Sequence, residues 1–486
     1  MHNKITTLGA LKKSKYVSMS IKEELRFNLI NNIKAGKSSF TGIHGYETTV
    51  IPQLEKAILS QHNINLLGLR GQAKTRLARL MVNLLDEYIP AIKDSEINDD
   101  PLKPISLFGK SQVEIHGDKT QITWIHRSER FYEKLATPDV TISDLIGDID
   151  PIKAANLKLS YADERVLHFG MIPRANRSIF VINELPDLQA RIQVALFNIL
   201  EEGDIQIRGF KLRMPIDVQF VFTANPEDYT NRGSIVTPLK DRIGSQILTH
   251  YPQNLEIAKT ITAQEASLQD VRKADIYIPK LAKDLIEQIG FEARESEYVD
   301  SKSGVSARMS ITEYENLLSS AEYRCLRSGA KSTSIRFSDV YGIIPAITGK
   351  VELVYEGEQE GSSFVAHRLI AEAIKTLFLN HFPKIEKLKH ESDKDPYEAV
   401  QSWFFEEGAF ELLDDTSDAD YANALNKIDP LEDLISKYVP GRDEKDILFM
   451  KEFILWALVE LEVLNKKKID EGVSFQDKHN SYIAGI

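Results

Sequence analysis

The stretch of sequence that decides the fold reads Gly68-Leu69-Arg70-Gly71-Gln72-Ala73-Lys74-Thr75. It follows an apolar segment at residues 64–69, which predicts a short strand, and it leads into residues 76–88, where Leu and Met recur at helical spacing. A glycine-containing loop between a strand and a helix is the setting of the phosphate-binding loop G-x-x-x-x-G-K-[ST]. Ala73 stands where this pattern has its second glycine, so the strict pattern is not met. A chance glycine turn before a lysine-bearing helix is the alternative.

A phosphate-binding loop predicts ATP and Mg²⁺ as cofactors. Backbone N–H groups of the loop and the N-terminus of the following helix together form an anion site. Lys74 would contact the β- and γ-phosphates, and the Thr75 hydroxyl would ligate Mg²⁺. The predicted cofactor-binding residues in this stretch are Gly68, Gly71, Gln72, Ala73, Lys74, Thr75 and Arg76.

A second polar site follows an apolar run about a hundred residues later, Phe180-Val181-Ile182-Asn183-Glu184. The run predicts a buried parallel strand, as in a Walker B motif. That motif usually ends in Asp, which holds Mg²⁺ through water, and Glu, which polarises the attacking water. Asn183 takes the Asp position as a candidate metal residue, so we expect weaker Mg²⁺ binding and expect Asn183→Asp to strengthen it. Glu184 keeps the position of the base. A polar strand end without a catalytic role is the alternative.

Three more polar residues are candidates for the same site. Asn225 ends the apolar run at 220–224 and could orient the attacking water, although an Asn-Pro pair after a strand is usually a turn. Arg242, in Pro238-Leu239-Lys240-Asp241-Arg242, could act as an arginine finger on a neighbouring subunit's γ-phosphate, or form a surface ion pair. Arg308 is a candidate sensor-2 residue with the same alternative.

Strand–loop–helix units alternate through the first half of the chain, which favours an α/β layer architecture. We predict a P-loop core with a parallel sheet, an all-α lid and a C-terminal, mostly helical region. The expected division is a helical lead-in at 1–40, an α/β nucleotide-binding domain at 41–253, a helical lid at 254–350, an acidic linker at 351–363 and a C-terminal helical domain of unknown role at 364–486.

Composition and charge exclude several classes of protein. The 486 residues are 42% hydrophobic and 27% charged, which is typical of a globular chain and not of a disordered one. The whole chain has a net charge of −12. Residues 351–486 alone have 29 acidic and 15 basic side chains, a net charge of −14. The first 350 residues are therefore near neutral, which argues against nucleic acid as a partner. We expect the acidic tail to fold or dock independently of the core and to bind a basic partner surface.

The sequence indicates neither a structure held by cysteines nor a segment that crosses a membrane. A single cysteine, Cys325, excludes an intramolecular disulfide framework and a cysteine-rich zinc site. The sequence has no apolar run of about 18 residues and no apolar segment typical of a secretory signal. We therefore expect a cytoplasmic protein without a membrane partner.

The order and spacing of these motifs resemble the AAA+ ATPases of the MoxR and magnesium-chelatase I-subunit group, which form a helix-2 insertion clade. That group carries a similar G-x-x-G-x-A-K-T loop, with an alanine in the position of Ala73. The resemblance covers about residues 40–350, and Asn183 is its main departure. Further similar stretches are Asp144 to Asp150 at the insertion entry, Gly170 to Ser178 before the Walker B strand, Gln193 to Gly203, Arg208-Gly209-Phe210 in the presensor-1 hairpin, Asn225-Pro226-Glu227, Pro238 to Arg242, and Ser306-Ala307-Arg308.

The resemblance implies an ATPase that works as a homo-oligomeric ring, expected to be a hexamer, with ATP between subunits. One subunit would supply Lys74, Thr75, Glu184 and Asn225, its neighbour would supply Arg242, and Arg308 could act from either side. Ile43 and Tyr46 are similar to the family's segment beside the adenine. The implied function is remodelling of a protein partner, which in related systems often carries a von Willebrand A domain.

Three other functions stay open. The neutral Asn183 favours a nucleotide-binding scaffold with little turnover. A DNA-stimulated motor is possible by family, but the near-neutral core and the acidic tail speak against it. A metal-chelatase motor subunit is possible by family name, although nothing in the sequence indicates a porphyrin site.

Overall fold

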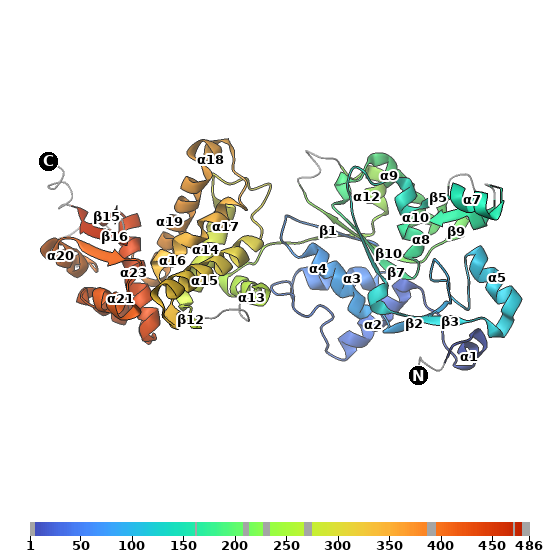
Figure 1. Ribbon diagram of the computed structural model, residues 1–486, viewed down its shortest axis with the longest axis horizontal. Coiled ribbons are helices and arrows are strands. Elements are labelled where there is room, and N and C mark those ends of the chain that lie inside the picture. Colours follow the sequence, from blue (N-terminus) through green and yellow to red (C-terminus); the bar gives the residue numbers. More distant parts are fainter. Residues whose placement is uncertain are drawn as a thin grey trace. The chain divides into compact units, whose positions relative to one another are not determined.

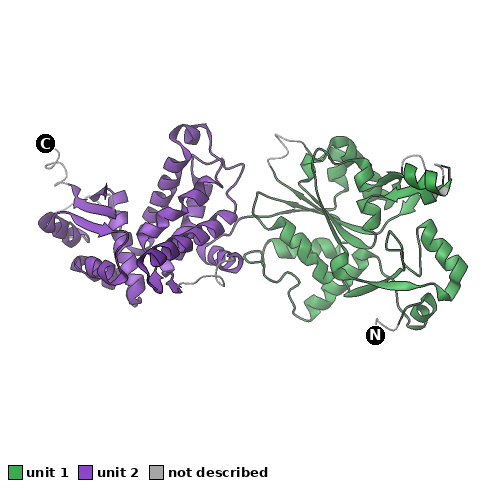
Figure 2. Ribbon diagram, in the orientation of Figure 1, with its two compact units in different colours: residues 1–250 green, residues 251–486 purple. Residues whose placement is uncertain are grey.

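The computed structural model describes residues 5–160, 163–207, 213–226, 234–266, 275–385, 395–469 and 472–478. The chain divides into two compact units, residues 1–250 and residues 251–486 (Figure 1; Figure 2). Unit 1 contains two hydrophobic cores and unit 2 contains one.

A five-stranded parallel sheet forms the centre of unit 1 (Figure 1). The strand order is β11-β1-β10-β7-β4, and every neighbouring pair runs parallel. All residues of β1, β7 and β10 are buried, which explains why these strands read as mostly apolar runs in the sequence. The predicted parallel-sheet α/β core is confirmed. The strands are β1 (Ile64–Leu67), β4 (Phe131–Leu135), β7 (Ser178–Asn183), β10 (Val218–Ala224) and β11 (Ser245–Leu248).

Helices cover both faces of this sheet, because successive strand residues point to opposite faces. Ile179 and Val181 of β7 share a core with α2, α3 and α4 on one face. Phe180 and Ile182 share a core with α6, α8, α9, α10 and α12 on the other. The bounds are α2 (Ile21–Lys34), α3 (Val50–Leu59), α4 (Lys74–Leu80), α6 (Ile142–Leu145), α8 (Met171–Arg174), α9 (Ala190–Ala195), α10 (Phe197–Glu202) and α12 (Thr237–Arg242).

The other elements of unit 1 are short helices and two-stranded sheets. Antiparallel pairs are formed by β2 with β3, β5 with β6, and β8 with β9. The last pair is the hairpin expected before β10; its tip, with the predicted Arg208-Gly209-Phe210 motif, lies outside the described residues. The bounds are α1 (Leu8–Lys13), η2 (Met81–Leu84), β2 (Tyr88–Ile92), α5 (Leu107–His116), η3 (Gly117–Lys119), β3 (Ile122–His126), η4 (Arg127–Glu129), β5 (Gly147–Ile149), α7 (Pro151–Leu157), η5 (Glu164–Val166), β6 (Leu167–Phe169), η6 (Leu185–Asp187), β8 (Asp204–Gln206) and β9 (Arg213–Pro215).

A buried ion pair fastens the N-terminal helix α2 to this core. The Arg130 guanidinium donates to both carboxylate oxygens of Glu24, at 2.7 and 2.6 Å, and to the carbonyl oxygen of Arg177 at 2.9 Å. Arg130 is 1% exposed and Glu24 is 4% exposed. Losing either partner would leave the other charge buried without a counter-ion, which is strongly destabilising. The segment predicted as a lead-in therefore contributes Glu24 to the buried interior of unit 1.

Unit 2 is mostly helical, with one small antiparallel sheet of order β14-β16-β15 and one parallel pair, β12 and β13. Its helices are α13 (Leu255–Glu265), α14 (Lys280–Glu295), α15 (Arg308–Ser328), α16 (Phe337–Val340), η8 (Tyr341–Ile343), α17 (Ile344–Thr348), α18 (Tyr355–Glu360), α19 (Ser362–His381), α20 (Glu398–Glu407), α21 (Asp418–Leu425), α22 (Asp429–Tyr438) and α23 (Glu444–Glu460). Its strands are β12 (Asp275–Tyr277), β13 (Ser332–Ser334), β14 (Phe410–Leu413), β15 (Leu464–Ile469) and β16 (Gly472–Asp477).

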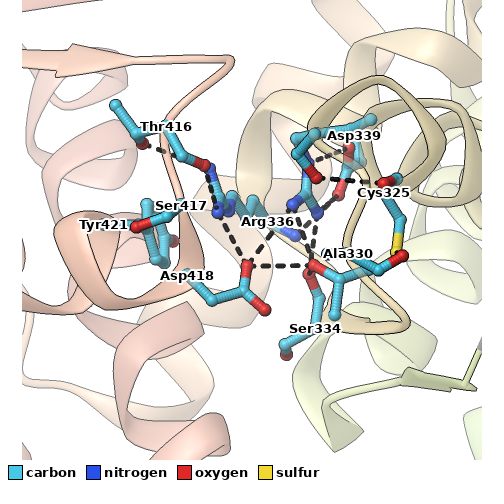
Figure 3. A network of polar contacts seen from close by, with 12 residues as sticks. Cys325, Ala330, Ser334, Arg336, Asp339, Thr416, Ser417, Asp418 and Tyr421 are labelled. Atoms are coloured by element: carbon cyan, nitrogen blue, oxygen red, sulfur yellow. Dashed lines mark hydrogen bonds and ion pairs between the residues drawn. The ribbon is translucent and has the colours of Figure 1, made fainter.

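The segments expected as lid and C-terminal domain share one hydrophobic core, which runs from Leu281 to Phe475. A polar network joins the same two segments (Figure 3). The Arg336 guanidinium donates to the Thr416 carbonyl oxygen at 2.9 Å and to Asp418 Oδ1 at 2.7 Å, and the Arg336 backbone N–H donates to Asp339 Oδ2 at 2.8 Å. Part of the acidic tail thus packs in one hydrophobic core with residues 281–350. The finer domain boundaries stay predictions.

Two predicted segments differ from the observed elements. The helix expected at 76–88 is shorter: α4 ends at Leu80, η2 follows, and Tyr88 begins β2. Residues 351–363, expected as a linker, contain α18 and the start of α19. A Cβ atom on Gly357 would lie 2.5 Å from the Tyr298 carbonyl oxygen, so α18 lies directly against the preceding chain. Charge and glycine content indicated a solvated linker, but they do not report such backbone contacts.

None of the helices described here is both long and apolar enough to cross a bilayer.

Glu452 on α23 provides a test of the unit 2 core. Its Oε2 accepts hydrogen bonds from the Tyr421 hydroxyl at 2.5 Å and from the Phe337 N–H at 2.9 Å, and burial raises the pKa of the carboxyl to about 7. Because this folded-state pKa exceeds the ordinary value of 4.5, the stabilisation is fully present below about pH 4.5 and is lost as pH rises through about 7. Between pH 5 and pH 8 we expect the free energy of unfolding to fall by about 2 kcal/mol more in the wild type than in Glu452→Gln. Urea unfolding at the two pH values measures this, and equal pH dependence in both proteins would contradict it.

Candidate nucleotide-binding site

The predicted phosphate-binding loop lies between the end of β1 and the start of α4, as the sequence indicated. Gly71 and Ala73 have φ values of +74° and +56°, so both adopt the left-handed conformation. A glycine is the usual residue there because it has no Cβ, and alanine adopts this conformation at a cost of about 1 kcal/mol. A Cβ on Gly68 would lie 2.0 Å from Thr249 Oγ1, so only glycine fits this position unless its neighbours move.

Side chains around the loop hold its backbone in place. The Thr249 hydroxyl, just after β11, lies 2.7 Å from Gln72 Oε1 and donates to it. The Tyr46 hydroxyl lies 3.0 Å from the Gln72 carbonyl oxygen and 2.7 Å from that of His250. Gln72 and Tyr46, both predicted to bind the nucleotide, therefore support the loop itself. Ile43 is buried in the core shared with α2 and α3. Their contact with a nucleotide stays a prediction.

Lys74 is the first residue of α4 and is 7% exposed. Its Nζ donates hydrogen bonds to the carbonyl oxygens of Gly68 and Leu69. The ammonium group thus lies inside the curve of the loop, next to the backbone that a phosphate chain would contact. Arg70 in the same loop is exposed.

Thr75, Asn183 and Thr223 meet at the carboxyl end of the sheet. Thr75 Oγ1 lies 3.3 Å from Asn183 Oδ1, and Thr223 Oγ1 lies 3.1 Å from the same oxygen. The Asn183 amide nitrogen donates to Glu133 Oε1 at 2.6 Å. Thr75 and Asn183, predicted as metal residues from positions far apart in the sequence, are therefore brought together.

Glu184 and Asn225 follow β7 and β10, two neighbouring parallel strands. The Glu184 backbone has a φ of 53°, and its N–H donates to Thr223 Oγ1 at 3.1 Å. Asn225 is 7% exposed, and its Oδ1 accepts no hydrogen bond from the described residues. Both residues lie at the carboxyl edge of the sheet, where the loop follows β1. A buried amide oxygen of this kind suits a water or ligand donor.

The two arginines predicted to contact ATP lie in different units, Arg242 in unit 1 and Arg308 in unit 2. The Arg242 guanidinium pairs with Glu201, with Nη2 2.6 Å from Oε2, and lies over the Phe197 ring at 5.2 Å. This ion pair is the alternative foreseen from the sequence. Arg308 is an exposed residue at the start of α15 in unit 2, where its backbone N–H donates to Ser306 Oγ at 3.2 Å. Arg76 follows Thr75 on α4. The roles of these arginines stay predictions.

The donors at the strand ends fit a Mg²⁺ ion that is completed by phosphate and water oxygens. Mg²⁺ prefers hard oxygen ligands and keeps several waters when it binds with a nucleotide. Thr75 supplies a hydroxyl, Asn183 an amide oxygen and Glu133 a nearby carboxylate. Across the described part of the chain, no group of three or more His, Cys, Asp or Glu residues could hold a metal by itself. A metal here would therefore arrive with its nucleotide.

Glu133, Thr223 and Thr249 lie at this site but were not predicted from the sequence. Glu133 lies on β4, and its contact with Asn183 depends on β4 pairing with β7. Thr223 is the second-last residue of β10, and Thr249 directly follows β11. No motif marks these three residues, because their proximity follows from strand order.

Comparison with known proteins gives one family match and several similar structures. Residues 157–244 match the Sigma-54 interaction domain. No curated protein matches the chain.

Three of the similar solved structures show the distance in sequence. A magnesium chelatase complex of the subunits BchI and BchD has a chain with 19% identity and a TM-score of 0.34, over 66% of this chain and 98% of that one. A proposed ATPase from Cytophaga hutchinsonii has 17% identity and a TM-score of 0.28, over 74% and 97%. A RuvB mutant from Thermotoga maritima has 11% identity and a TM-score of 0.34, over 96% and 94%.

The parallel sheet, the loop between β1 and α4, and the match to the Sigma-54 interaction domain support placing the α/β core in the AAA+ group of P-loop proteins.

Proposed function

We propose that this chain is an ATPase of the MoxR and magnesium-chelatase type, which binds Mg²⁺·ATP at residues 68–75. The observation that carries the proposal is the convergence of the loop, Thr75, Asn183, Glu184 and Asn225 at the carboxyl edge of β1, β7 and β10. In open α/β sheets, this edge is where ligands bind. Lys74 would neutralise the β- and γ-phosphates, and Thr75 with Asn183 would hold the metal and its water shell.

Hydrolysis would use Glu184 as the base. Glu184 polarises a water for attack on the γ-phosphorus, and Asn225 orients that water through its buried amide oxygen. Lys74, and Arg242 from a second subunit, would offset the charge that builds on the γ-phosphate oxygens, and a metal held near Thr75 and Asn183 would supply further positive charge there. The proton of the attacking water passes to the Glu184 carboxylate, and ADP and phosphate leave.

The proposal includes a hexameric ring in the cytoplasm that remodels a protein client, for which a von Willebrand A domain protein is a candidate. Arg242 would leave Glu201 and contact the γ-phosphate of the neighbouring subunit. A second candidate function, a nucleotide-binding scaffold with little turnover, is favoured by the neutral Asn183 and by the Arg242–Glu201 pair.

A subunit-mixing experiment tests the shared site. Arg242→Ala should still bind ATP but lose turnover by about tenfold or more, because one charge-assisted contact to the transferring phosphoryl group is removed. Glu184→Gln should also be inactive. In randomly mixed rings of equal amounts, about one quarter of interfaces pair an intact Glu184 with an intact Arg242, so up to a quarter of wild-type turnover should return.

The matched control is Glu201→Gln, which releases Arg242 from its ion pair and should not lower turnover. Mixed rings that stay as inactive as their components would show that Arg242 acts within its own subunit or only in the ion pair with Glu201.

A further inference from the structure

Both the oxygen and the nitrogen of the Asn183 carboxamide form hydrogen bonds. Its oxygen accepts from the hydroxyls of Thr75 and Thr223, at 3.3 and 3.1 Å, and its nitrogen donates to Glu133 Oε1 at 2.6 Å. A carboxylate can only accept, so it requires the amide nitrogen on its side. Glu133 therefore fixes the Asn183 side chain with its oxygen toward Thr75.

Glu133 reaches Asn183 because of the sheet register. In the parallel pair of β4 with β7, Glu133 is opposite Val181 and Leu135 is opposite Asn183. Glu133 and Asn183 are thus diagonal neighbours, within reach for long side chains. The second carboxylate oxygen of Glu133 accepts from Arg79 Nε and Nη2 of α4, at 3.0 and 2.8 Å. The Glu133 side chain is 26% exposed and that of Arg79 is 62% exposed.

We infer that Glu133 supplies the negative charge that the Walker B position lacks in this chain. Glu133 is a positioning residue: it orients the Asn183 amide, and the charged hydrogen bond makes the amide oxygen a stronger acceptor for a water of the Mg²⁺ shell. The negative charge lies one strand away from its usual place, while the amide oxygen keeps the position facing Thr75. This inference rests on the proposed binding of Mg²⁺·ATP.

The register also reverses the expectation for Asn183→Asp. An Asp carboxylate at 183 would lie about as close to Glu133 as the present 2.6 Å contact. Two carboxylates repel each other at that distance and have no hydrogen to share, so the contact with Glu133 would be lost. The single substitution should therefore weaken Mg²⁺ binding rather than strengthen it. Combining Asn183→Asp with Glu133→Gln exchanges the amide and the carboxylate and keeps one charge and one hydrogen bond.

The experiment titrates Mg²⁺ at equilibrium into the 486-residue chain with a fluorescent ATP analogue. Four proteins are compared: the wild type, Glu133→Gln, Asn183→Asp and the double variant. We expect each single variant to raise the half-saturating Mg²⁺ concentration by about tenfold and the double variant to return it to within about threefold of the wild type. Glu129→Gln is the matched control. It removes one carboxylate from η4, just before β4, and should leave the titration unchanged.

Three outcomes would decide against the inference. An Asn183→Asp variant that binds Mg²⁺ more tightly while Glu133→Gln is unchanged would overturn it, and so would a double variant as weak as the single ones. Thermal unfolding, and binding of the analogue in the absence of Mg²⁺, identify any variant that fails to fold. If an Asn183 variant fails to fold, the Mg²⁺ titration of Glu133→Gln alone decides whether the inference holds. A wild type that binds no ATP analogue at all would overturn the proposed function as well, whereas tight binding that is insensitive to Glu133 would overturn the inference alone.

Discussion

Lys74→Ala is expected to weaken ATP binding by about 100-fold, because it removes charge-assisted hydrogen bonds to two phosphates. Lys74 is buried and already lies inside the loop, with its Nζ on the carbonyl oxygens of Gly68 and Leu69. Those carbonyls can be exchanged for phosphate oxygens by a small movement of the side chain. Isothermal titration calorimetry with ATP and Mg²⁺ measures the effect.

The matched control for this prediction is Arg70→Ala. Arg70 belongs to the same loop and carries the same charge, but it is exposed, so its loss should reduce affinity by only a few-fold. Equal losses in both variants would mean that the loop attracts ATP by its general positive charge. Unchanged affinity in Lys74→Ala would mean that the nucleotide binds elsewhere.

Glu184→Gln is expected to lower the rate of ATP hydrolysis by about 1000-fold while ATP affinity stays within a few-fold of the wild type. Gln has the size of Glu and keeps the backbone hydrogen bond from residue 184 to Thr223, but it cannot accept the proton of the attacking water. Phosphate release under saturating ATP and Mg²⁺ measures the rate. If the variant turned over as fast as the wild type, another group would be the base.

The sequence was sufficient for the α/β core. Buried parallel strands such as β7 and β10 read as mostly apolar runs, and each is followed by a polar residue at the sheet edge. The loop from Gly68 to Lys74 could be recognised because its strand and helix flank it directly. Ala73 departs from the glycine of the pattern, but alanine can adopt the left-handed backbone conformation at this position at a modest cost.

Contacts between distant strands could not be predicted in the same way. Glu133 and Asn183 are fifty residues apart and meet only because β4 lies beside β7 in a particular register. The pairing of Arg242 with Glu201 depends likewise on how α12 lies against α10. A sequence motif records residue types and spacing, and neither of them specifies which side chain a carboxylate will face.

Unit 2 shows a second limit of sequence reasoning. The acidic composition of residues 351–486 predicted an independent tail, yet α19 and α23 bury apolar faces in the same core as α14 and α15. Net charge reports the solvated surface of such helices and leaves their buried faces unseen. The small sheet of β14, β15 and β16 was missed because β15 is rich in lysine, which is uncommon in buried strands and acceptable in an exposed one.

The most direct test of the central claim is a structure of Glu184→Gln with ATP and Mg²⁺. The account predicts a triphosphate held by residues 68–75, with Lys74 Nζ bonded to phosphate oxygens in place of the Gly68 and Leu69 carbonyls. It also predicts a metal next to Thr75 and Asn183. A nucleotide bound elsewhere, or Lys74 still on the two carbonyls with no phosphate beside it, would contradict the account.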